Sequence, residues 1–382
     1  MTSFRRLLTA LVLVVLSNLP AMGSDLESLL KTLKSVGPKG AGNREARQAW
    51  DELMQSDADQ LPTMLAGLDD ANPLAANWIR TAVDAVAERE VRRGGKLPVD
   101  RLEQFVLDTR HDPRARRLAY EWLRRVDRSA PQRLIPKMLD DPSLEMRRDA
   151  VAVVIDRAAA LEKAEQADRA VPVYREALSA ARDLDQVRLA AERLRKLGQE
   201  VDLPRHFGFL IRWKVLGPFD NTDQKGFDTV FPPERKIDLN AAYEGKHGEV
   251  RWVDHVTEHD YGKVDLNKVL KKEKAVAAYA LSRFVSEKPQ EVDVRVTSVN
   301  AVKLWVNGRL VARHHVYHAG SQMDQYVSRV TLAQGSNVIL VKVCQNAITP
   351  EWADPWGFQL RICDARGTAI LSADRDRPSP QE

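Results

Sequence analysis

Two strand-turn-strand patterns near the carboxyl end constrain the fold of this chain more than any other feature. In the first, Asn307-Gly308 separates two short apolar runs, and a two-residue type I′ turn needs the positive backbone φ angles that Asn and Gly tolerate. In the second, a Gly-Ser-Asn loop at 335–337 precedes the β-branched run 338–343, which suits a half-buried strand. With further short apolar runs nearby, these patterns predict an antiparallel β-sandwich over residues 207–373.

Three segments in the amino-terminal half share a signature that is typical of a helix start. In each, an Asn or Asp side chain stands directly before a proline: Asn72-Pro73, Asp112-Pro113 and Asp141-Pro142. Such a side chain accepts hydrogen bonds from the first backbone amides of a helix, and the missing amide hydrogen of proline is not needed there. Apolar residues follow each pair at helical spacing. The three starts predict two-helix units over residues 24–161.

The stretch from Asn43 to Leu161 resembles HEAT repeats because of these three starts. The resemblance implies an α-solenoid that serves protein contact, whose helix pairs stack because no single pair buries its apolar stripe alone. Residues 162–200 contain the runs A-V-P-V-Y-R-E-A-L and V-R-L-A-A-E-R-L and resemble one tetratricopeptide-like hairpin. A plain helical hairpin that caps or links the solenoid is the alternative. Residues 374–382 are predicted to be a disordered tail.

The amino terminus has the parts of a secretory signal peptide. Arg5 and Arg6 precede an apolar run at 7–16, and small residues surround a predicted cleavage site after Gly23. The run is about half of the roughly 20 residues that span a bilayer, which disfavours an uncleaved anchor. We therefore expect residues 1–23 to be removed and the protein to be exported to the periplasm or the extracellular space, with no membrane span after cleavage.

Charge and cysteine content narrow the classes of partner and scaffold. Lys and Arg number 58 and Asp and Glu 54, and a net charge of +4 is too near neutral to indicate a nucleic-acid partner. The two cysteines, Cys344 and Cys363, are too few for a disulfide-built scaffold. An oxidising compartment would permit one bridge between them, and two unpaired strand thiols are the alternative.

The carboxy-terminal region also resembles a known family. The motifs V-K-L-W-V-N-G-R-L-V, L-A-Q-G-S-N-V-I-L-V-K-V and W-G-F-Q-L-R-I, in that order, resemble the galactose-binding-like jelly rolls that accompany many exported bacterial proteins. The likeness runs from Arg212 to Ala373. It implies a sandwich of the jelly-roll type that binds a ligand, usually a carbohydrate, and catalyses no reaction. Most of the matching positions serve the fold rather than an activity.

Most candidate ligand-binding residues lie in or beside the loop 345–355, at an end of the predicted sandwich where binding sites often occur. An exposed indole there presents a flat apolar face on which a sugar ring stacks. For Trp356 the alternative is a cap on the core. The segment R-H-H-V-Y-H adds His315 from the neighbouring loop. The candidates from the first loop are Trp352, Trp356, Glu351 and Asp354.

Trp305 is a further candidate with two interpretations. It stands two residues before Asn307, so in a two-residue hairpin it lies opposite Leu310 on the next strand. The first interpretation is a cross-strand packing pair. The second is a sugar-stacking platform.

Two groups of residues were considered as metal ligands. Asp220, Asp223 and Asp228 resemble a calcium loop in composition, and related jelly rolls often carry a structural calcium ion. The EF-hand spacing is absent, and turn formation is the alternative. His255 and His259 would lie roughly 13 Å apart on a strand, too far to share one ion. We therefore expect no zinc site and no other cofactor.

The sequence lacks the patterns of common catalytic sites. It contains no G-x-S-x-G, no P-loop and no G-x-G-x-x-G, and nothing brackets the pair of carboxylates that a glycosidase needs. We therefore predict a multidomain α plus β protein without enzyme activity, in which the sandwich binds glycan and the helical repeats contact protein. One alternative is a structural scaffold in an exported assembly that makes only protein contacts. Another is a hydrolase with an unrecognised site.

Overall fold

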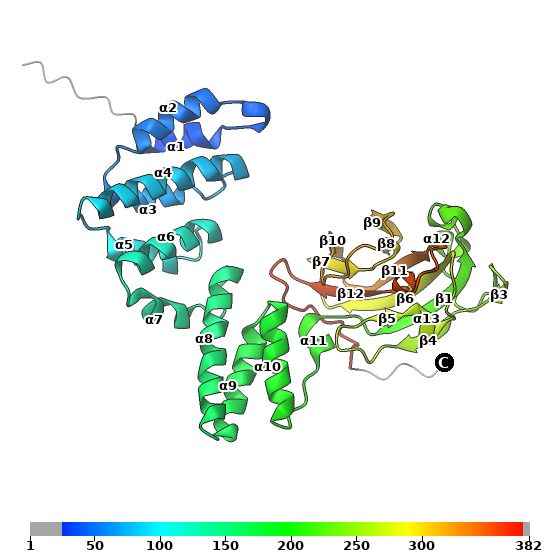
Figure 1. The fold of residues 1–382 in the computed structure, drawn as a ribbon. Coiled ribbons are helices and arrows are strands. Elements are labelled where there is room, and N and C mark those ends of the chain that lie inside the picture. Colours follow the sequence, from blue (N-terminus) through cyan, green and yellow to red (C-terminus); the bar gives the residue numbers. More distant parts are fainter. Residues whose placement is uncertain (1–24, 377–382) are drawn as a thin grey trace, which may run out of the picture. The chain divides into compact units, whose positions relative to one another are not determined.

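The computed structural model describes residues 25–376, so the predicted signal peptide lies outside the described residues. The chain divides into two compact units between Leu134 and Ile135. The first unit is helical, and the second contains further helices followed by antiparallel sheets (Figure 1). This arrangement confirms the predicted α plus β fold class.

The first unit is built from pairs of neighbouring helices. Helix α1 packs on α2, α3 on α4 and α5 on α6, and α4 and α6 each also contact a helix of the preceding pair. The repeated contact buries an apolar stripe on each helix, as the helical spacing of the sequence predicts. The elements are α1 (Leu26–Lys34), η1 (Pro38–Gly40), α2 (Asn43–Leu53), η2 (Ala58–Gln60), α3 (Leu61–Ala66), α4 (Pro73–Arg92), α5 (Val99–Leu107), α6 (Pro113–Val126) and α7 (Ala130–Leu134).

Two of the three predicted helix starts are confirmed and one is wrong. The Asn72 side chain accepts hydrogen bonds from the amides of Leu74 and Ala75, and Asp112 accepts one from Arg114, as expected of N-caps before a proline. The third helix, α8, begins at Leu144 rather than at Pro142. Ser143 is its N-cap and accepts from the Met146 amide, while Asp141 accepts from the Ser143 amide and only forms the preceding turn.

The second unit begins with helices that include the predicted hairpin. Helices α9 and α10 form this hairpin, and both contact α8 or each other. Their apolar faces meet in a cluster that includes Val151, Ala177 and Val187 and extends to Phe207 and Phe209 at the start of the sheet region. The elements are η3 (Ile135–Lys137), α8 (Leu144–Lys163), α9 (Ala167–Ala180), α10 (Leu184–Lys196) and α11 (Leu203–Phe207).

Two antiparallel sheets follow, together with a small two-stranded sheet. The larger sheet has the strand order β4-β1-β6-β11-β8-β9, and the smaller has the order β10-β7-β12-β5 (Figure 1). Short helical turns occupy the connections: η4 (Thr222–Phe227), α12 (Pro232–Arg235), α13 (Leu266–Val269) and η5 (Glu351–Ala353). The strands are β1 (Arg212–Asp220), β2 (Tyr243–Gly245), β3 (Gly248–Val250), β4 (Val253–Val256), β5 (Val264–Asp265), β6 (Val276–Ser286), β7 (Gln290–Thr297), β8 (Ala301–Val306), β9 (Arg309–His314), β10 (Tyr326–Leu332), β11 (Gly335–Gln345) and β12 (Gly357–Cys363).

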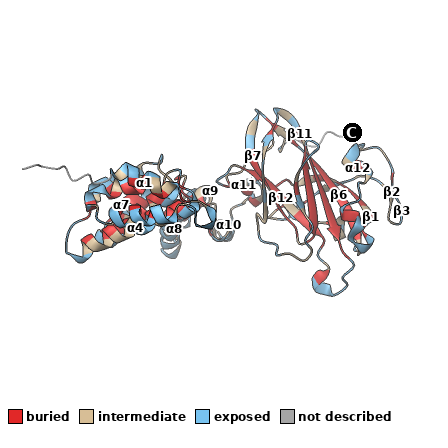
Figure 2. Ribbon diagram, turned by 90° about the horizontal axis from the view of Figure 1, so that it is seen from above, coloured by how far each residue is buried: buried red, intermediate tan, exposed pale blue. Residues whose placement is uncertain are grey.

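The two main sheets pack face to face around one core. Alternate residues of the large sheet, such as Val215 and Val341, share a buried cluster with Val294, Leu360 and their neighbours on the small sheet. Strands β6 and β12 are buried over most of their length (Figure 2). The shared core makes the two sheets a sandwich, in which each sheet turns one face inward, and the continuous burial of β6 and β12 means that their outer faces are covered as well.

The turn chemistry read from the sequence sets the register of the hairpin. Val306 pairs with Arg309, and Asn307 and Gly308 have φ angles of 51° and 78°, as a type I′ turn requires. The Asn307 side-chain Nδ2 also donates to Asn337 Oδ1 at 2.8 Å. Asn337 therefore joins the two predicted turns, which the sequence patterns described separately.

The outer face of the large sheet buries a lysine. Lys342 is fully buried, and its ammonium donates to Glu234 Oε1 at 2.8 Å and to the Thr229 carbonyl at 2.7 Å. Its Nζ lies 4.9 Å from the ring centre of Phe231 and 5.5 Å from that of Tyr279. Since burial disfavours charge, it lowers the pKa of Lys342. The segment that carries η4 and α12 thus covers this face.

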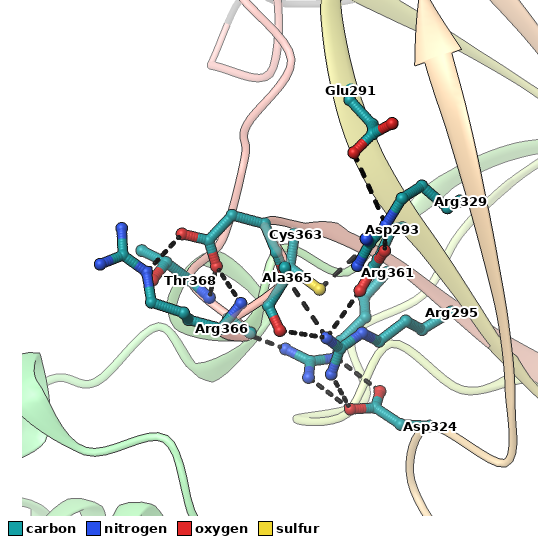
Figure 3. A network of polar contacts seen from close by, with 12 residues as sticks. Glu291, Asp293, Arg295, Asp324, Arg329, Arg361, Cys363, Ala365, Arg366 and Thr368 are labelled. Carbon is teal, nitrogen blue, oxygen red and sulfur yellow. Dashed lines mark hydrogen bonds and ion pairs between the residues drawn. The ribbon is translucent and has the colours of Figure 1, made fainter. Parts of the chain in front are cut away.

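The outer face of the small sheet buries a network of arginines and aspartates (Figure 3). Arg361 on β12 and Arg295 on β7 are directly opposed across the strands, and such like charges repel. Asp324 lies between them and accepts from Arg361 Nε at 2.6 Å and from Arg295 Nη1 at 2.9 Å. Asp293 accepts from Arg295 Nη2 at 2.9 Å and from Arg329 Nε at 3.0 Å. Arg295, Asp293 and Asp324 therefore each have opposite partners on more than one element, whereas Arg361 pairs with Asp324 alone.

Three further expectations are tested by the described residues. Cys344 and Cys363 are both buried free thiols on strands of different sheets. The strand expected at 262–266 is reduced to the two residues of β5, because Leu266 begins α13. The predicted tail starts too early, since Arg375 donates to the Phe209 carbonyl at 3.1 Å. The rest of that tail, from residue 377, lies outside the described residues.

Candidate functional site

One end of the sandwich gathers the loops that carry most of the candidate residues. Strands β1, β7, β9 and β11 end there, and β6, β8, β10 and β12 begin there, as the antiparallel pairings require. The loops are joined by hydrogen bonds: the Asn221 side-chain amide donates to Tyr317 Oη at 3.1 Å and to the Gln345 carbonyl at 2.9 Å, and the Ala275 amide donates to the Asn346 carbonyl at 2.9 Å. Segments distant in sequence therefore form one surface.

Five rings follow one another across this end, and we call them the aromatic row. They are Phe227, His315, Tyr317, His318 and Trp352. Consecutive ring centres are 4.2, 5.6, 6.4 and 4.9 Å apart in that order. The first pair is stacked and the last pair meets edge to face, both of which are favourable aromatic geometries.

The rings of the aromatic row differ in how they meet solvent. Phe227 is buried and supports His315, which is exposed. Tyr317 is half-buried, and this burial raises the pKa of its hydroxyl to about 12. The Trp352 indole is 65% exposed, the most exposed of the large apolar side chains on the described surface. The aromatic row thus runs from a ring in the core, Phe227, to the solvent-exposed indole of Trp352.

The loop that carries Trp352 is held from below by buried amides. Gln345 Nε2 donates to the Ala353 carbonyl at 2.9 Å. Asn300 Nδ2 donates to Gln345 Oε1 at 3.0 Å and to the Pro355 carbonyl at 3.1 Å. Since these bonds hold the carbonyls at the carboxyl end of η5 and just after it, the loop is anchored without burial of the indole.

The two candidate carboxylates of this loop are in different electrostatic settings. Asp354 pairs with Lys272 Nζ at 2.6 Å and with Lys274 Nζ at 3.1 Å, and these hydrogen bonds lower its pKa. Glu351 is exposed and forms no ion pair with a described residue. Glu351 therefore stands free beside Trp352, whereas Asp354 is neutralised.

The other two tryptophan candidates are placed in the core. Trp356 is almost fully buried, and its indole Nε1 donates to the Val343 carbonyl at 3.2 Å. Trp305 is 9% exposed and pairs with Leu310 across β8 and β9. Neither ring presents a face to solvent, so for these residues the packing interpretation fits and the platform interpretation does not.

The three aspartates of the calcium hypothesis do not converge. Asp220 accepts from the Thr222 hydroxyl at 2.7 Å, which lowers its pKa, and Asp223 pairs with Lys225. Asp228 pairs with Arg313 at 2.8 Å. Within residues 25–376, no group of three or more His, Cys, Asp or Glu side chains is arranged to hold a metal ion. The geometry therefore gives the predicted calcium site no support, and turn formation accounts for Asp220.

Sequence reasoning missed part of the aromatic row. Phe227, Tyr317 and His318 were not among the predicted ligand-binding residues. The signal for Tyr317 and His318 was the crowding of rings in the segment R-H-H-V-Y-H. Phe227 left no such signal, because it comes from a turn far away in the sequence.

No helix among the described residues is long and apolar enough to cross a membrane.

Comparisons with known proteins reveal only distant likenesses. No protein-family model matches the sequence, and no curated protein matches it. Among solved structures, an anti-sigma factor domain-containing protein from Clostridium clariflavum is 14% identical, with 43% of this chain and 45% of that chain covered and a TM-score of 0.25. A β-glucosidase from Kluyveromyces marxianus is 14% identical, with 45% and 21% covered and a TM-score of 0.26.

A shorter structure is matched over more of its own length. A family 35 carbohydrate-binding module from Clostridium thermocellum is 14% identical, with 23% of this chain and 72% of that module covered and a TM-score of 0.18. In contrast, the chain spans less than half the length of the first two structures. Likenesses at these scores assign neither a fold family nor an activity.

Proposed function

We propose that this protein binds carbohydrate, without chemistry, through the aromatic row at the end of its sandwich, and that it acts as an exported protein. The observation that carries the proposal is the exposed Trp352 indole on a loop that is held from below. Exposure of a large indole leaves apolar surface in water that a ligand can cover. Because the loop is already ordered, little conformational entropy is lost when a ligand binds.

The chemistry of the site suits a sugar. The face of a pyranose ring is apolar and stacks on an aromatic ring, while its hydroxyls need hydrogen-bond partners at the rim. His318 and Glu351 lie next to the indole and supply such partners. The neutral Tyr317 hydroxyl and the exposed His315 extend the surface beyond one sugar unit.

The carboxylates of the loop support binding rather than hydrolysis. A glycosidase needs one carboxylic acid whose pKa is raised, so that it protonates the leaving group, and a second carboxylate across the scissile bond. Asp354 has the opposite property, since two lysines lower its pKa. Only Glu351 then remains unpaired beside Trp352.

Binding to immobilised polysaccharides tests this function. For a polysaccharide that binds the parent protein, we expect Trp352→Ala to bind about tenfold or more weakly, because stacked aromatic anchors dominate such interfaces. Trp352→Phe should bind more tightly than Trp352→Ala. Leu310→Ala is the matched control, because Leu310 is an exposed apolar residue of β9 near the opposite end of the sandwich. No retention by any neutral or acidic polysaccharide, or equal retention of Trp352→Ala, would overturn the proposal.

A second candidate function is protein contact by the helical unit. Trp50 and Trp78 meet edge to face with ring centres 6.5 Å apart, and the Arg47 guanidinium lies 5.6 Å from the Trp50 ring centre. Half-buried tryptophan with arginine is the composition of interface hot spots. A stoichiometric partner that co-purifies with the parent but not with Trp50→Ala, in a protein without glycan binding, would favour a structural scaffold.

A further inference from the structure

A groove lies between helix α10 and the loop that joins β4 to β5. Its cavity volume is about 460 Å³, within the range of roughly 300–1,000 Å³ that is typical of small-molecule sites. It lies at the other end of the sandwich from the aromatic row, because β4 ends at Val256, which pairs with Arg212 at the start of β1. Its lining includes Arg188, Ala191, Glu192, Arg195, Leu203 and Tyr261.

The groove has an apolar floor and one fixed aromatic wall. Ala191 and Leu203 are buried beneath it. The Tyr261 ring packs against Phe207, with ring centres 5.9 Å apart. The loop that carries Tyr261 is closed by the Thr257 hydroxyl, which donates to the Lys263 carbonyl at 2.6 Å. The wall is therefore preorganised.

Gly262 explains how this loop approaches the sheet so closely. Its φ angle is 58°, and a Cβ at this position would lie 2.5 Å from the Cβ of Phe209. Any side chain here would push the loop away from Phe209. The position of Tyr261 thus follows from the lack of a side chain at its neighbour.

The charges around the groove leave one cation, Arg188, without a carboxylate partner within residues 25–376, and its side chain hydrogen-bonds the Tyr261 hydroxyl instead. Arg195 holds Asp260 with both terminal nitrogens, each at 2.7 Å, and Lys196 pairs with Glu192 at 2.9 Å. Arg188 forms no ion pair with a carboxylate among the described residues. Its guanidinium carbon lies 6.0 Å from the Tyr261 ring centre. The lining therefore carries one uncompensated positive charge beside an aromatic wall.

We propose that this groove is a second ligand site, which binds an acidic saccharide with one sugar ring on Tyr261 and one carboxylate on Arg188. The guanidinium fork matches a carboxylate in bidentate geometry, and a ring over an apolar floor suits the apolar face of a pyranose. A phosphate dianion fits less well, because Arg195 and Lys196 are already neutralised. This site does not depend on the aromatic row.

Calorimetric titration of the full chain with trimers of galacturonate and of mannuronate tests the proposal. The methyl esters of the same trimers are matched ligands that lack the charge. We expect at least one acid to bind and its ester to bind about tenfold or more weakly, because a charge-assisted hydrogen-bond pair is lost. The affinity of the acid should also fall with added salt.

Variants of α10 assign the binding to the groove. Arg188→Gln should lower the affinity for the acid by about tenfold and leave the affinity for the ester unchanged. Arg188→Lys should give an intermediate affinity for the acid, since lysine keeps the positive charge but not the planar guanidinium. Arg193→Gln is the matched control, because Arg193 lies on the same helix but pairs with Glu162. All of these side chains are partly or largely exposed, so thermal melting should show that the variants are folded.

The outcomes separate this site from the aromatic row. If the proposal holds, Trp352→Ala binds the acidic trimer like the parent, whereas Arg188→Gln binds it about tenfold more weakly. Failure of both acids to bind, equal binding of acid and ester, or full binding by Arg188→Gln would overturn it. Loss of acid binding in Trp352→Ala alone would assign the acidic ligand to the aromatic row instead, and would also overturn it.

Discussion

The outer faces of the two sheets bury charge in different ways. On the large sheet Lys342 meets one carboxylate, two backbone carbonyls and two aromatic rings, and Lys303, which lies directly opposite it on β8, pairs with Asp228. On the small sheet Arg361 and Arg295 share Asp324, and Asp293 adds a further link (Figure 3). In the first arrangement each buried lysine has a carboxylate of its own. In the second, two arginines share one carboxylate in a network.

The difference matters because the two kinds of cation respond differently when a partner is lost. A buried lysine can release its proton, and burial already lowers the pKa of Lys342. An arginine cannot be deprotonated in a protein. We therefore expect the small sheet to depend more strongly on its carboxylates than the large sheet does.

The largest effect should follow from loss of the Asp324 charge. Asp324→Asn tolerates the positive φ angle of 64° but leaves Arg361 without a carboxylate partner, directly opposite Arg295, which keeps only Asp293. We expect the free energy of unfolding to fall by about 3–5 kcal/mol in chemical denaturation. The control is Glu291→Gln, whose exposed pair with Arg329 should contribute about 0–1 kcal/mol. Equal effects of the two variants would contradict the network.

A smaller effect should follow from loss of the Glu234 charge on the other sheet. Glu234→Gln keeps an acceptor for Lys342 and for the Tyr279 hydroxyl, so we expect a loss of about 1–3 kcal/mol. Adding Lys342→Met should restore stability to within about 1.5 kcal/mol of the parent, because an apolar side chain of similar size needs no counter-charge. If the double variant is less stable than Glu234→Gln, the description of Lys342 as a replaceable point charge is wrong.

The small sheet should also show pH dependence through His206 on its covering helix α11. Burial, together with the nearby Arg182 and Arg361, lowers the pKa of His206 to about 4 from an ordinary value of 6.5. Between these values the unfolded chain binds a proton that the folded chain does not, so stability should fall as the pH decreases from about 6.5 to 4. We expect a loss of about 1–2 kcal/mol, because the ring is only partly shielded from solvent.

Unfolding measured at pH 7, 5.5 and 4.5 tests this effect. His206→Gln should flatten the profile, whereas His247→Gln controls for the loss of an imidazole at an exposed position. An unchanged slope in His206→Gln would assign the acid sensitivity to other groups.

The smallest effect on stability should come from the aromatic row. Trp352→Ala removes an indole that is mostly exposed, so we expect the free energy of unfolding to change by about 0.5 kcal/mol or less. The same variant should lose glycan binding. A large loss of stability in thermal melting would instead make Trp352 a structural residue, like Trp356.

Much of the fold was predictable from local patterns. The Asn307-Gly308 turn, two of the three helix starts and the alternation of the strands all depend on residues close together in sequence. The helix start at Pro142 failed because two adjacent side chains, Asp141 and Ser143, both suit a cap, and local chemistry does not choose between them.

The candidate site was predictable only in part. Trp352, Glu351 and His315 were named from their loops, but composition did not distinguish the exposed Trp352 from the buried Trp356 four residues later. Their difference arises because Trp356 directly precedes β12 and turns its indole toward the Val343 carbonyl. Phe227 joins the row from the η4 turn, which is far from the other rings in sequence.

The sequence by itself determined the α plus β class and the turns, since these follow from the conformational preferences of neighbouring residues. Only the tertiary structure decided which aromatic rings are in contact, and which charged side chains have an oppositely charged partner and which do not. Strand pairing places Arg361 opposite Arg295, with Asp324 between them. The loop from β4 to β5 places Tyr261 beside Arg188, which has no carboxylate partner in the described part of the chain. The reason is physical: these contacts join residues that are far apart in the chain, and their energies depend on burial that no local pattern contains.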